Sequence, residues 1–527
     1  MLSNGLLLVV AIVSQVAAAL QAPSAAAACR TARRAAFSSF GRADLVDAPM
    51  HVDGAIPSWL SGTYVRNGPG LFEVGDERRV EHWFDGYAML LRVSLAGSRP
   101  PLLSTKFIAS DSHAAVRERG SMACAEFMTP LVPPGGGLGD VLKSFVSLAA
   151  GEPTDNACVN IVRRGGRLEA MTETQRSWFE IDPSSLATLR RVEWEGDAVG
   201  QLSTAHAQRD PLGGGYINVG TEIAPPLGSC YRIFRLDDEA PHRRQVLATI
   251  ACADRAAPFW LHAFGLTRRA VVVIEQPAAY SVTAMLGLGS ASHGSIDWRA
   301  PLGTRVHVLD RSSGVVRTHT LHPAFFFFHV ANAFDRPDGS TCLDICAFDS
   351  PQIVTALRLD ALLDDDDENA RDLPESRLQR LTLPAADDDR PPTMAPVDDD
   401  ASGKFCDLPS IAPSAVGDPA YRYVYTIGAA RPTLVSNRLC KVDVTGACPT
   451  CIFEREGMLP GEPLFVPRPG ASDEDDGVVL SMGTDADGGS SLYVLDASDM
   501  SLLARCRSPV ALPAGFHGAW LEDCAET

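Results

Sequence analysis

Short strand-like runs recur from about residue 50 to the C-terminus, each bounded by Gly, Pro or Asp. Clear examples are Ala270–Glu275, Tyr421–Ile427 and Ser491–Asp496. Runs rich in Val, Ile, Leu and aromatic residues with such boundaries predict β-strands, and long amphipathic helical patterns are scarce. We therefore expect an all-β fold.

Several of these runs end alike, in an aspartate followed by a Gly or Ser turn. The segments are Val308–Ser312, Lys441–Gly446 and Val494–Ser498. A recurring unit of this kind indicates the blades of a β-propeller. The repeat is too degenerate to establish a propeller by itself.

Four histidines are spread through this β region beside aromatic or small residues: His206, His262, His329 and His517. The inner strands of propeller blades face one axis, so residues distant in sequence can meet there around one ion. A lone histidine beside aromatics is more often a core residue, but four such contexts favour a metal site. The other eight of the 12 histidines, including His82, are assigned structural roles.

Charge and cysteine content exclude other classes of protein. The net charge of -19 argues against a nucleic-acid partner. Much of this charge lies in acidic runs expected to be solvated loops, and residues 361–404 are expected to be an acidic loop insertion.

Thirteen cysteines are too dilute for a disulfide scaffold. Cys448 and Cys451 lack the second pair of a zinc site, so we expect structural thiols, with a local disulfide or redox role as alternatives.

Residues 1–45 differ from the rest of the chain. The apolar run Leu6–Val13, followed by Ala17–Ala19, is typical of a secretory signal, and Ser24–Arg42 has four arginines and no acid, as transit peptides do. We expect a signal and transit-like presequence over residues 1–45 and one folded domain over residues 46–527. The two-part pattern is similar to plastid presequences of algae with secondary plastids; secretion is the alternative.

Two further motifs carry a family resemblance. Ile56–Gly70, which reads IPSWLSGTYVRNGPG, and His82–Gly86, which reads HWFDG, resemble the opening of carotenoid cleavage oxygenases. That family includes the 9-cis-epoxycarotenoid dioxygenases and the related retinoid isomerohydrolases. The four histidine contexts match it in order, from about residue 45 to the C-terminus. The resemblance implies a seven-bladed β-propeller with a few short helices on one face and an axial Fe(II) bound by His206, His262, His329 and His517.

The resemblance also implies three carboxylates that bind the outer nitrogens of the histidines. Glu173 and Glu462 match the family glutamates, and the third position is Asp407. Aspartate is one methylene shorter, so we expect a shift of roughly 1 Å or a bridging water there. Alternatively, Asp407 is a turn residue before Pro409.

The activity implied is a non-haem iron dioxygenase that uses O2 to cleave a carbon–carbon double bond of a carotenoid or apocarotenoid, giving two carbonyl products. Neither a dinucleotide-binding glycine motif after a strand nor a nucleophile elbow is present. The lipophilic polyene substrate predicts peripheral membrane contact, through Leu138–Ala150 and Val282–Leu288. Alternatives are an isomerase or isomerohydrolase, a stilbene-type cleaving enzyme, or a propeller that binds carotenoid without chemistry. The sequence does not indicate the oligomeric state.

Overall fold

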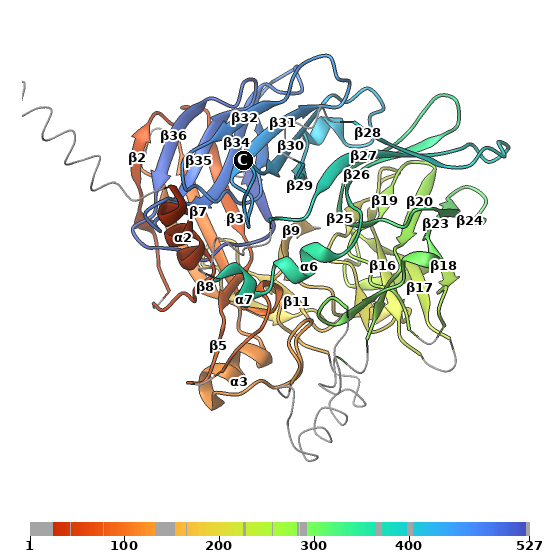
Figure 1. Cartoon of the computed structure of the whole chain (residues 1–527), viewed down its shortest axis with the longest axis horizontal. Helices are drawn as coiled ribbons and strands as arrows, with labels where there is room; N and C mark the ends of the chain where they lie inside the picture. Colours follow the sequence, from red (N-terminus) through yellow and green to blue (C-terminus); the bar gives the residue numbers. More distant parts are fainter. Residues whose placement is uncertain are drawn as a thin grey trace, which may run out of the picture.

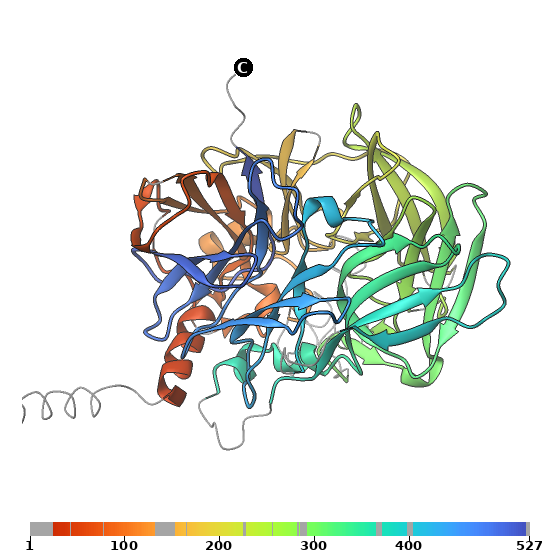
Figure 2. The same cartoon turned by 90° about the horizontal axis from the view of Figure 1, so that it is seen from above.

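The computed structural model describes residues 25–522, apart from 43, 77, 98, 132–152, 165, 225–227, 256, 282–283, 285–291, 365–371 and 398–403. Within this part the chain forms seven β-sheets of four to six strands, which are arranged as the blades of a propeller (Figures 1 and 2), and two two-stranded sheets. This arrangement confirms the expected all-β, seven-bladed propeller.

The first three blades, listed in sheet order, have these strands. The first contains β1 (Ala48–Pro49), β8 (Leu102–Phe107), β7 (Tyr87–Ala96), β3 (Ser61–Arg66) and β37 (Gly518–Glu522), with β4 (Pro69–Leu71) on β7. The second contains β12 (Thr188–Arg191), β11 (Trp178–Ile181), β10 (Arg167–Met171) and β9 (Asn160–Arg164). The third contains β13 (Glu195–Gly196), β18 (Arg243–Ala251), β17 (Cys230–Asp237), β16 (Gly215–Glu222) and β14 (Leu202–Ser203), with β15 (Gln208–Arg209) on β16.

The other four blades follow in chain order. The fourth contains β19 (Gly265–Leu266), β20 (Ala270–Glu275), β23 (Thr304–Asp310) and β24 (Val316–Leu321); the fifth contains β25 (Phe326–Asp335), β26 (Thr341–Phe348), β27 (Ser376–Leu383) and β28 (Thr393–Pro396). The sixth contains β29 (Asp407–Ser410), β30 (Tyr423–Gly428), β31 (Arg438–Asp443) and β32 (Cys451–Glu454). The seventh contains β2 (His51–Gly54), β36 (Leu502–Arg507), β35 (Ser490–Asp496), β34 (Gly477–Thr484) and β33 (Leu464–Pro467).

Short elements lie between the strands of the blades, and α3 lies between the first and the second blade. Two hairpins pair β5 (Glu73–Val74) with β6 (Arg78–Arg79) and β21 (Ala278–Tyr280) with β22 (Ile296–Trp298). The described helices are α2 (Ala25–Ala36), α3 (Asp111–Arg119), α6 (Gln352–Ala356) and α7 (Leu359–Leu362), with the 3₁₀ turns η1 (Trp83–Asp85), η2 (Ala300–Leu302) and η3 (Pro413–Ala415). None of these helices is long and apolar enough to cross a membrane.

Both chain ends close the ring. C-terminal β37 pairs with β3 in the first blade, where Tyr64 lies opposite Trp520. N-terminal β2 pairs with β36 in the seventh, where Val52 lies opposite Cys506. Figure 1 shows the red and blue ends of the chain side by side. Each end therefore contributes a strand to a blade formed mainly by the other end.

The repeated aspartate turns have a physical cause. The carboxylate of Asp310 accepts hydrogen bonds from the backbone N–H groups of Ser312 and Ser313, and Asp496 accepts one from Ser498. A side chain that bonds to its own backbone two residues on favours a tight turn. The repeat therefore marks the hairpins within blades.

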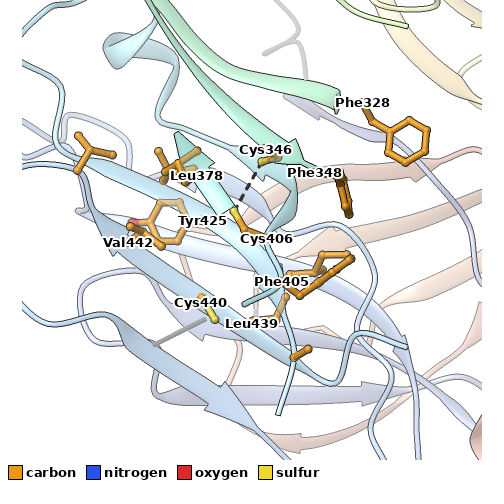
Figure 3. Close-up of a cluster of buried hydrophobic side chains, with 14 of the residues drawn as sticks. Phe328, Cys346, Phe348, Leu378, Phe405, Cys406, Tyr425, Leu439, Cys440 and Val442 are labelled. Atoms are coloured by element: carbon orange, nitrogen blue, oxygen red, sulfur yellow. Dashed lines mark hydrogen bonds between the residues drawn. The ribbon is translucent and has the colours of Figure 1, made fainter. Parts of the chain in front are cut away.

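An apolar cluster fixes the start of β29 against the fifth blade. Figure 3 shows Phe405 and Cys406 beside Phe348 and Cys346, and the Sγ atoms of the two cysteines lie 3.6 Å apart. All four side chains are buried. This packing anchors the residues immediately before Asp407.

The structure corrects the expected loop insertion over residues 361–404. Residues 376–383 and 393–396 form β27 and β28, the two strands of the fifth blade farthest from β25. Leu378, Leu381 and Leu383 are buried between more exposed polar residues. The neighbouring acidic runs obscure this strand pattern in the sequence.

Cys448 and Cys451 form no disulfide in the structure.

Part of the expected presequence lies within the fold. Helix α2 buries Ala32 and Ala36, and the Phe37 ring packs edge-on against Trp83 at a centroid distance of 5.4 Å. The buried Arg33 guanidinium donates to the carbonyl of Leu362 in α7. The run Leu6–Val13 and the segment Leu138–Ala150 lie outside the described residues, as does Val282–Leu288 apart from Ala284. The presequence therefore remains a prediction, and the structure favours a boundary before α2.

We predict that a protein starting at Gly41 is much less stable than one starting at Ser24. The shorter chain loses the buried side chains of α2 together with Phe37 and Phe40. Removing one buried phenylalanine side chain typically costs about 3–5 kcal/mol. Thermal unfolding followed by circular dichroism measures the difference, with Phe37→Ala as an intermediate case. Equal melting temperatures would show that α2 is dispensable.

Candidate metal centre

Four blades bring the four histidines to the propeller axis. His206 lies between β14 and β15, His262 precedes β19, His329 lies in β25 and His517 precedes β37. Their Nε2 atoms form a chain of short distances: 3.1 Å from His206 to His262, 3.3 Å from His262 to His329, and 3.1 Å from His329 to His517. All four candidate ligand atoms lie within 4.8 Å of one another.

The strand around His329 is irregular. The pairing of β25 with β26 shifts register between Phe327 and Val330. Such bulges re-aim side chains and are common beside active sites. The irregularity thus lies at His329, whose side chain faces the propeller axis.

Three carboxylates hold three of the imidazoles from behind. Nδ1 of His262 lies 2.5 Å from Oε1 of Glu173, and Nδ1 of His517 lies 2.7 Å from Oε1 of Glu462. Nδ1 of His329 lies 2.6 Å from Oδ1 of Asp407. His206 has no carboxylate partner in the described part of the chain. An imidazole that donates from Nδ1 presents an Nε2 lone pair, so these contacts select the ligand tautomer.

The carboxylates are themselves fixed by other donors. The indole of Trp260 donates to Oε2 of Glu173 at 2.7 Å, and the backbone N–H of Gly518 donates to Oε2 of Glu462 at 2.8 Å. The Leu408 N–H donates to Oδ1 of Asp407 at 2.9 Å. The three positions are therefore rigidly held.

Asp407 contacts His329 directly although its side chain is one methylene shorter than glutamate. The expected bridging water is not required, because the carboxylate reaches His329 directly. Asp407 is also the first residue of β29, so it faces the axis from a strand rather than from a turn before Pro409.

Burial shapes the protonation of the centre. Burial lowers the pKa of His206 and His329 well below the usual value, and the neighbouring imidazoles act in the same direction. Burial also raises the pKa of Asp407 to about 7, against the effect of the Leu408 N–H. The His206 and His329 imidazoles are therefore neutral at pH 7, as ligation requires.

The geometry fits a divalent metal ion. For metal–nitrogen bonds of about 2.1 Å, adjacent octahedral ligands lie about 3.0 Å apart. The observed Nε2 separations of 3.1–3.3 Å are close to this spacing. Four such ligands leave two positions of an octahedron.

A cavity of about 720 Å³ opens onto the centre beside His262, His329 and His517. Its wall is mainly apolar and aromatic; the rings that contribute include Phe84, Phe127, Trp260, Tyr280 and Phe328. Ala36 and Phe37 at the end of α2 also line it. The centre therefore faces a space suited to a long apolar ligand.

All seven residues proposed from the sequence meet at this centre, whereas the cavity wall escaped sequence reasoning. Asp85 lies within the motif His82–Gly86 and Trp260 lies two residues before His262, which gave a signal for both. Glu126, also in the wall, had no such signal.

A family model described as Retinal pigment epithelial membrane protein matches residues 41–522. The chain belongs to this family, that of the carotenoid cleavage oxygenases. The family member "Carotenoid cleavage dioxygenase 8, chloroplastic" of Arabidopsis thaliana is 32% identical, covering 90% of this chain and 84% of its own length. "Beta,beta-carotene 15,15'-dioxygenase" of Rattus norvegicus is 30% identical, covering 90% and 88%.

A solved structure in the same family supports the metal fit. Cobalt-substituted Synechocystis apocarotenoid oxygenase superimposes with a TM-score of 0.77 at 26% identity, covering 94% of this chain and 99% of that chain. That related protein was solved with cobalt in place of its own metal.

We predict that Asp407→Ala weakens metal binding by about 10–100-fold, the usual effect of losing a carboxylate behind a histidine ligand. Competition with a chelator measures the affinity. Asp389→Ala, which removes an exposed carboxylate near β28, is the control. An unchanged affinity in Asp407→Ala would rule out a supporting role.

Proposed function

We propose that this chain is an Fe(II)-dependent dioxygenase that cleaves a carbon–carbon double bond of a carotenoid or apocarotenoid. The observation that carries the proposal is a centre of four imidazoles that opens onto an apolar cavity. Relatives named carotenoid dioxygenases and an apocarotenoid oxygenase support it.

The ligand set suits iron. Imidazole ligands suit iron among other metals, and ferrous sites with open positions serve oxygenases. When bound, the iron would supply the oxygen chemistry. Both atoms of O2 enter the products, since one double bond and one O2 become two carbonyl groups, so no external reductant is needed.

The protein's own residues hold and shield the substrate. Aromatic rings such as Phe328, whose centroid lies 5.4 Å from that of His262, cover the centre. An apolar wall excludes water and aligns a polyene past the histidines. Glu173, Asp407 and Glu462 fix the imidazole rings, so that the substrate meets a rigid centre.

We predict about one iron per chain after anaerobic purification, and ¹⁸O-labelled carbonyl products when carotenoids are incubated under labelled O2. His262→Ala should lose both, because one of the four ligands is gone. His51→Ala, an exposed histidine in β2, is the control and should retain both.

Other results would select the alternatives. Isomers or products without label would indicate an isomerase or isomerohydrolase. Cleavage of stilbenes but not of carotenoids would indicate a stilbene-type enzyme. A chain that contains no iron yet retains carotenoid would be a binding protein.

The cellular location is part of the proposal. The chloroplastic relatives and the composition of the first 45 residues support import into a plastid. Peripheral membrane contact is proposed because the polyene substrate dissolves in bilayers.

From the composition of the two segments, we predict that residues 1–24 direct a fluorescent reporter to the secretory route and that residues 1–45 direct it to plastids. Microscopy in an alga with secondary plastids checks both. Secretion of the longer fusion would favour an extracellular enzyme.

A further inference from the structure

One stretch of the cavity wall is polar. Asp85, Glu126, Thr154 and Asn156 all line the cavity, and each side chain is more than nine-tenths buried. We call this set the polar niche. It contrasts with the apolar wall described above and plays no part in holding the histidines.

Three members of the polar niche have partners. Asp85 accepts from the Met128 N–H at 3.1 Å and from the Thr129 hydroxyl at 2.6 Å. Asn156 donates to the Gly86 carbonyl at 3.1 Å and accepts from the Ala88 N–H at 2.9 Å. Thr154 Oγ1 accepts from the Asn156 N–H at 3.0 Å. These groups are satisfied without a ligand.

Glu126 differs from them at one of its two carboxyl oxygens. Its Oε1 atom is buried and has no hydrogen-bond partner among the described residues. Buried polar atoms almost always have a partner, so an exception calls for an explanation. A ligand oxygen in the cavity would provide one.

The protonation of Glu126 restricts the ligand. Burial raises the pKa of Glu126 well above its usual value, the nearby Asp85 adds to the rise, and side-chain hydrogen bonds from Thr154 and Asn156 to the carboxyl group oppose it. A protonated carboxyl group both donates and accepts. It can therefore bind an alcohol or an aldehyde, whereas a carboxylate ligand would lie close to Asp85 in a medium that disfavours unpaired charge.

The polar niche lies close to the metal centre through a short series of contacts. Phe127, next to Glu126, packs against Trp260 at a centroid distance of 4.8 Å. Trp260 in turn donates to Glu173. The hydroxyl of Thr174, the residue after Glu173, donates to the carbonyl of Thr154 at 2.6 Å. A ligand end held at Glu126 would thus have a fixed position relative to the histidines.

We propose that Glu126 binds a neutral oxygen at one end of the polyene, so that the enzyme prefers an apocarotenoid alcohol or aldehyde to the hydrocarbon or the acid. The proposal rests on the proposed function, because it takes the occupant of the cavity to be a polyene. Glu126 is a specificity and positioning residue: it selects the end group and sets which double bond lies at the centre.

The test is equilibrium binding to the iron-loaded enzyme without oxygen, followed by quenching of tryptophan fluorescence. The probes are a β-apocarotenal, the alcohol and carboxylic acid derived from it, and the hydrocarbon of the same polyene length. Wild type is compared with Glu126→Gln, Glu126→Leu and the control Glu118→Leu, which changes an exposed residue of α3. Glu126→Gln keeps the shape of the side chain if Glu126→Leu fails to fold.

We expect wild type and Glu118→Leu to bind the alcohol and aldehyde about tenfold more tightly than the hydrocarbon, the effect of one hydrogen bond. Glu126→Leu should abolish this preference while binding the hydrocarbon at least as well as wild type. Glu126→Gln should keep part of it. Equal binding of all probes by wild type, or equal loss of all probes in Glu126→Leu, would overturn the proposal.

Product analysis separates this proposal from the proposed function. A wild type that prefers the oxygenated probes but yields no labelled cleavage product would contradict the dioxygenase and leave the role of Glu126 standing. Labelled cleavage without any end-group preference would contradict only the role of Glu126.

Discussion

The structure depends on the convergence of seven blades at one axis, to which each blade contributes one polar group. The first, third, fourth and fifth blades supply His517, His206, His262 and His329, and the second, sixth and seventh supply Glu173, Asp407 and Glu462. Four imidazoles bring no charge to a metal, while three carboxylates around them offset the charge of the ion. The propeller thus places the four histidines around one point and the three carboxylates in a second layer behind them.

The carboxylates do more than balance charge. Each accepts one hydrogen bond from a ring nitrogen and a second from a group fixed by the fold, so the ring planes are set by the protein alone. The apolar cluster before Asp407 also helps to fix a ring plane. It positions β29 so that the short Asp407 side chain reaches His329 directly. Asp407 needed no compensating water because its strand begins at the axis.

Short segments of the sequence predicted the strands, indicated propeller blades and marked the four histidines, whereas the seven blades and the three carboxylates were implied by the family resemblance. The predictions failed where an unusual amino-acid composition masked the pattern of buried residues. Acidic runs hid the buried leucines of β27, and an arginine-rich, acid-free segment hid the buried face of α2. Most of the cavity wall could not be predicted, since residues such as Phe37, Glu126 and Tyr280 meet only through long-range packing.

The exchange of strands between the chain ends has a consequence for the order of assembly. His517 immediately precedes β37, so the four-imidazole shell cannot form until this late segment has been made and has paired with β3. Pairings between such distant segments also form slowly during folding. The ring therefore closes and the set of four histidines is completed in the same step. An ion bound by all four histidines would stabilise the closed ring.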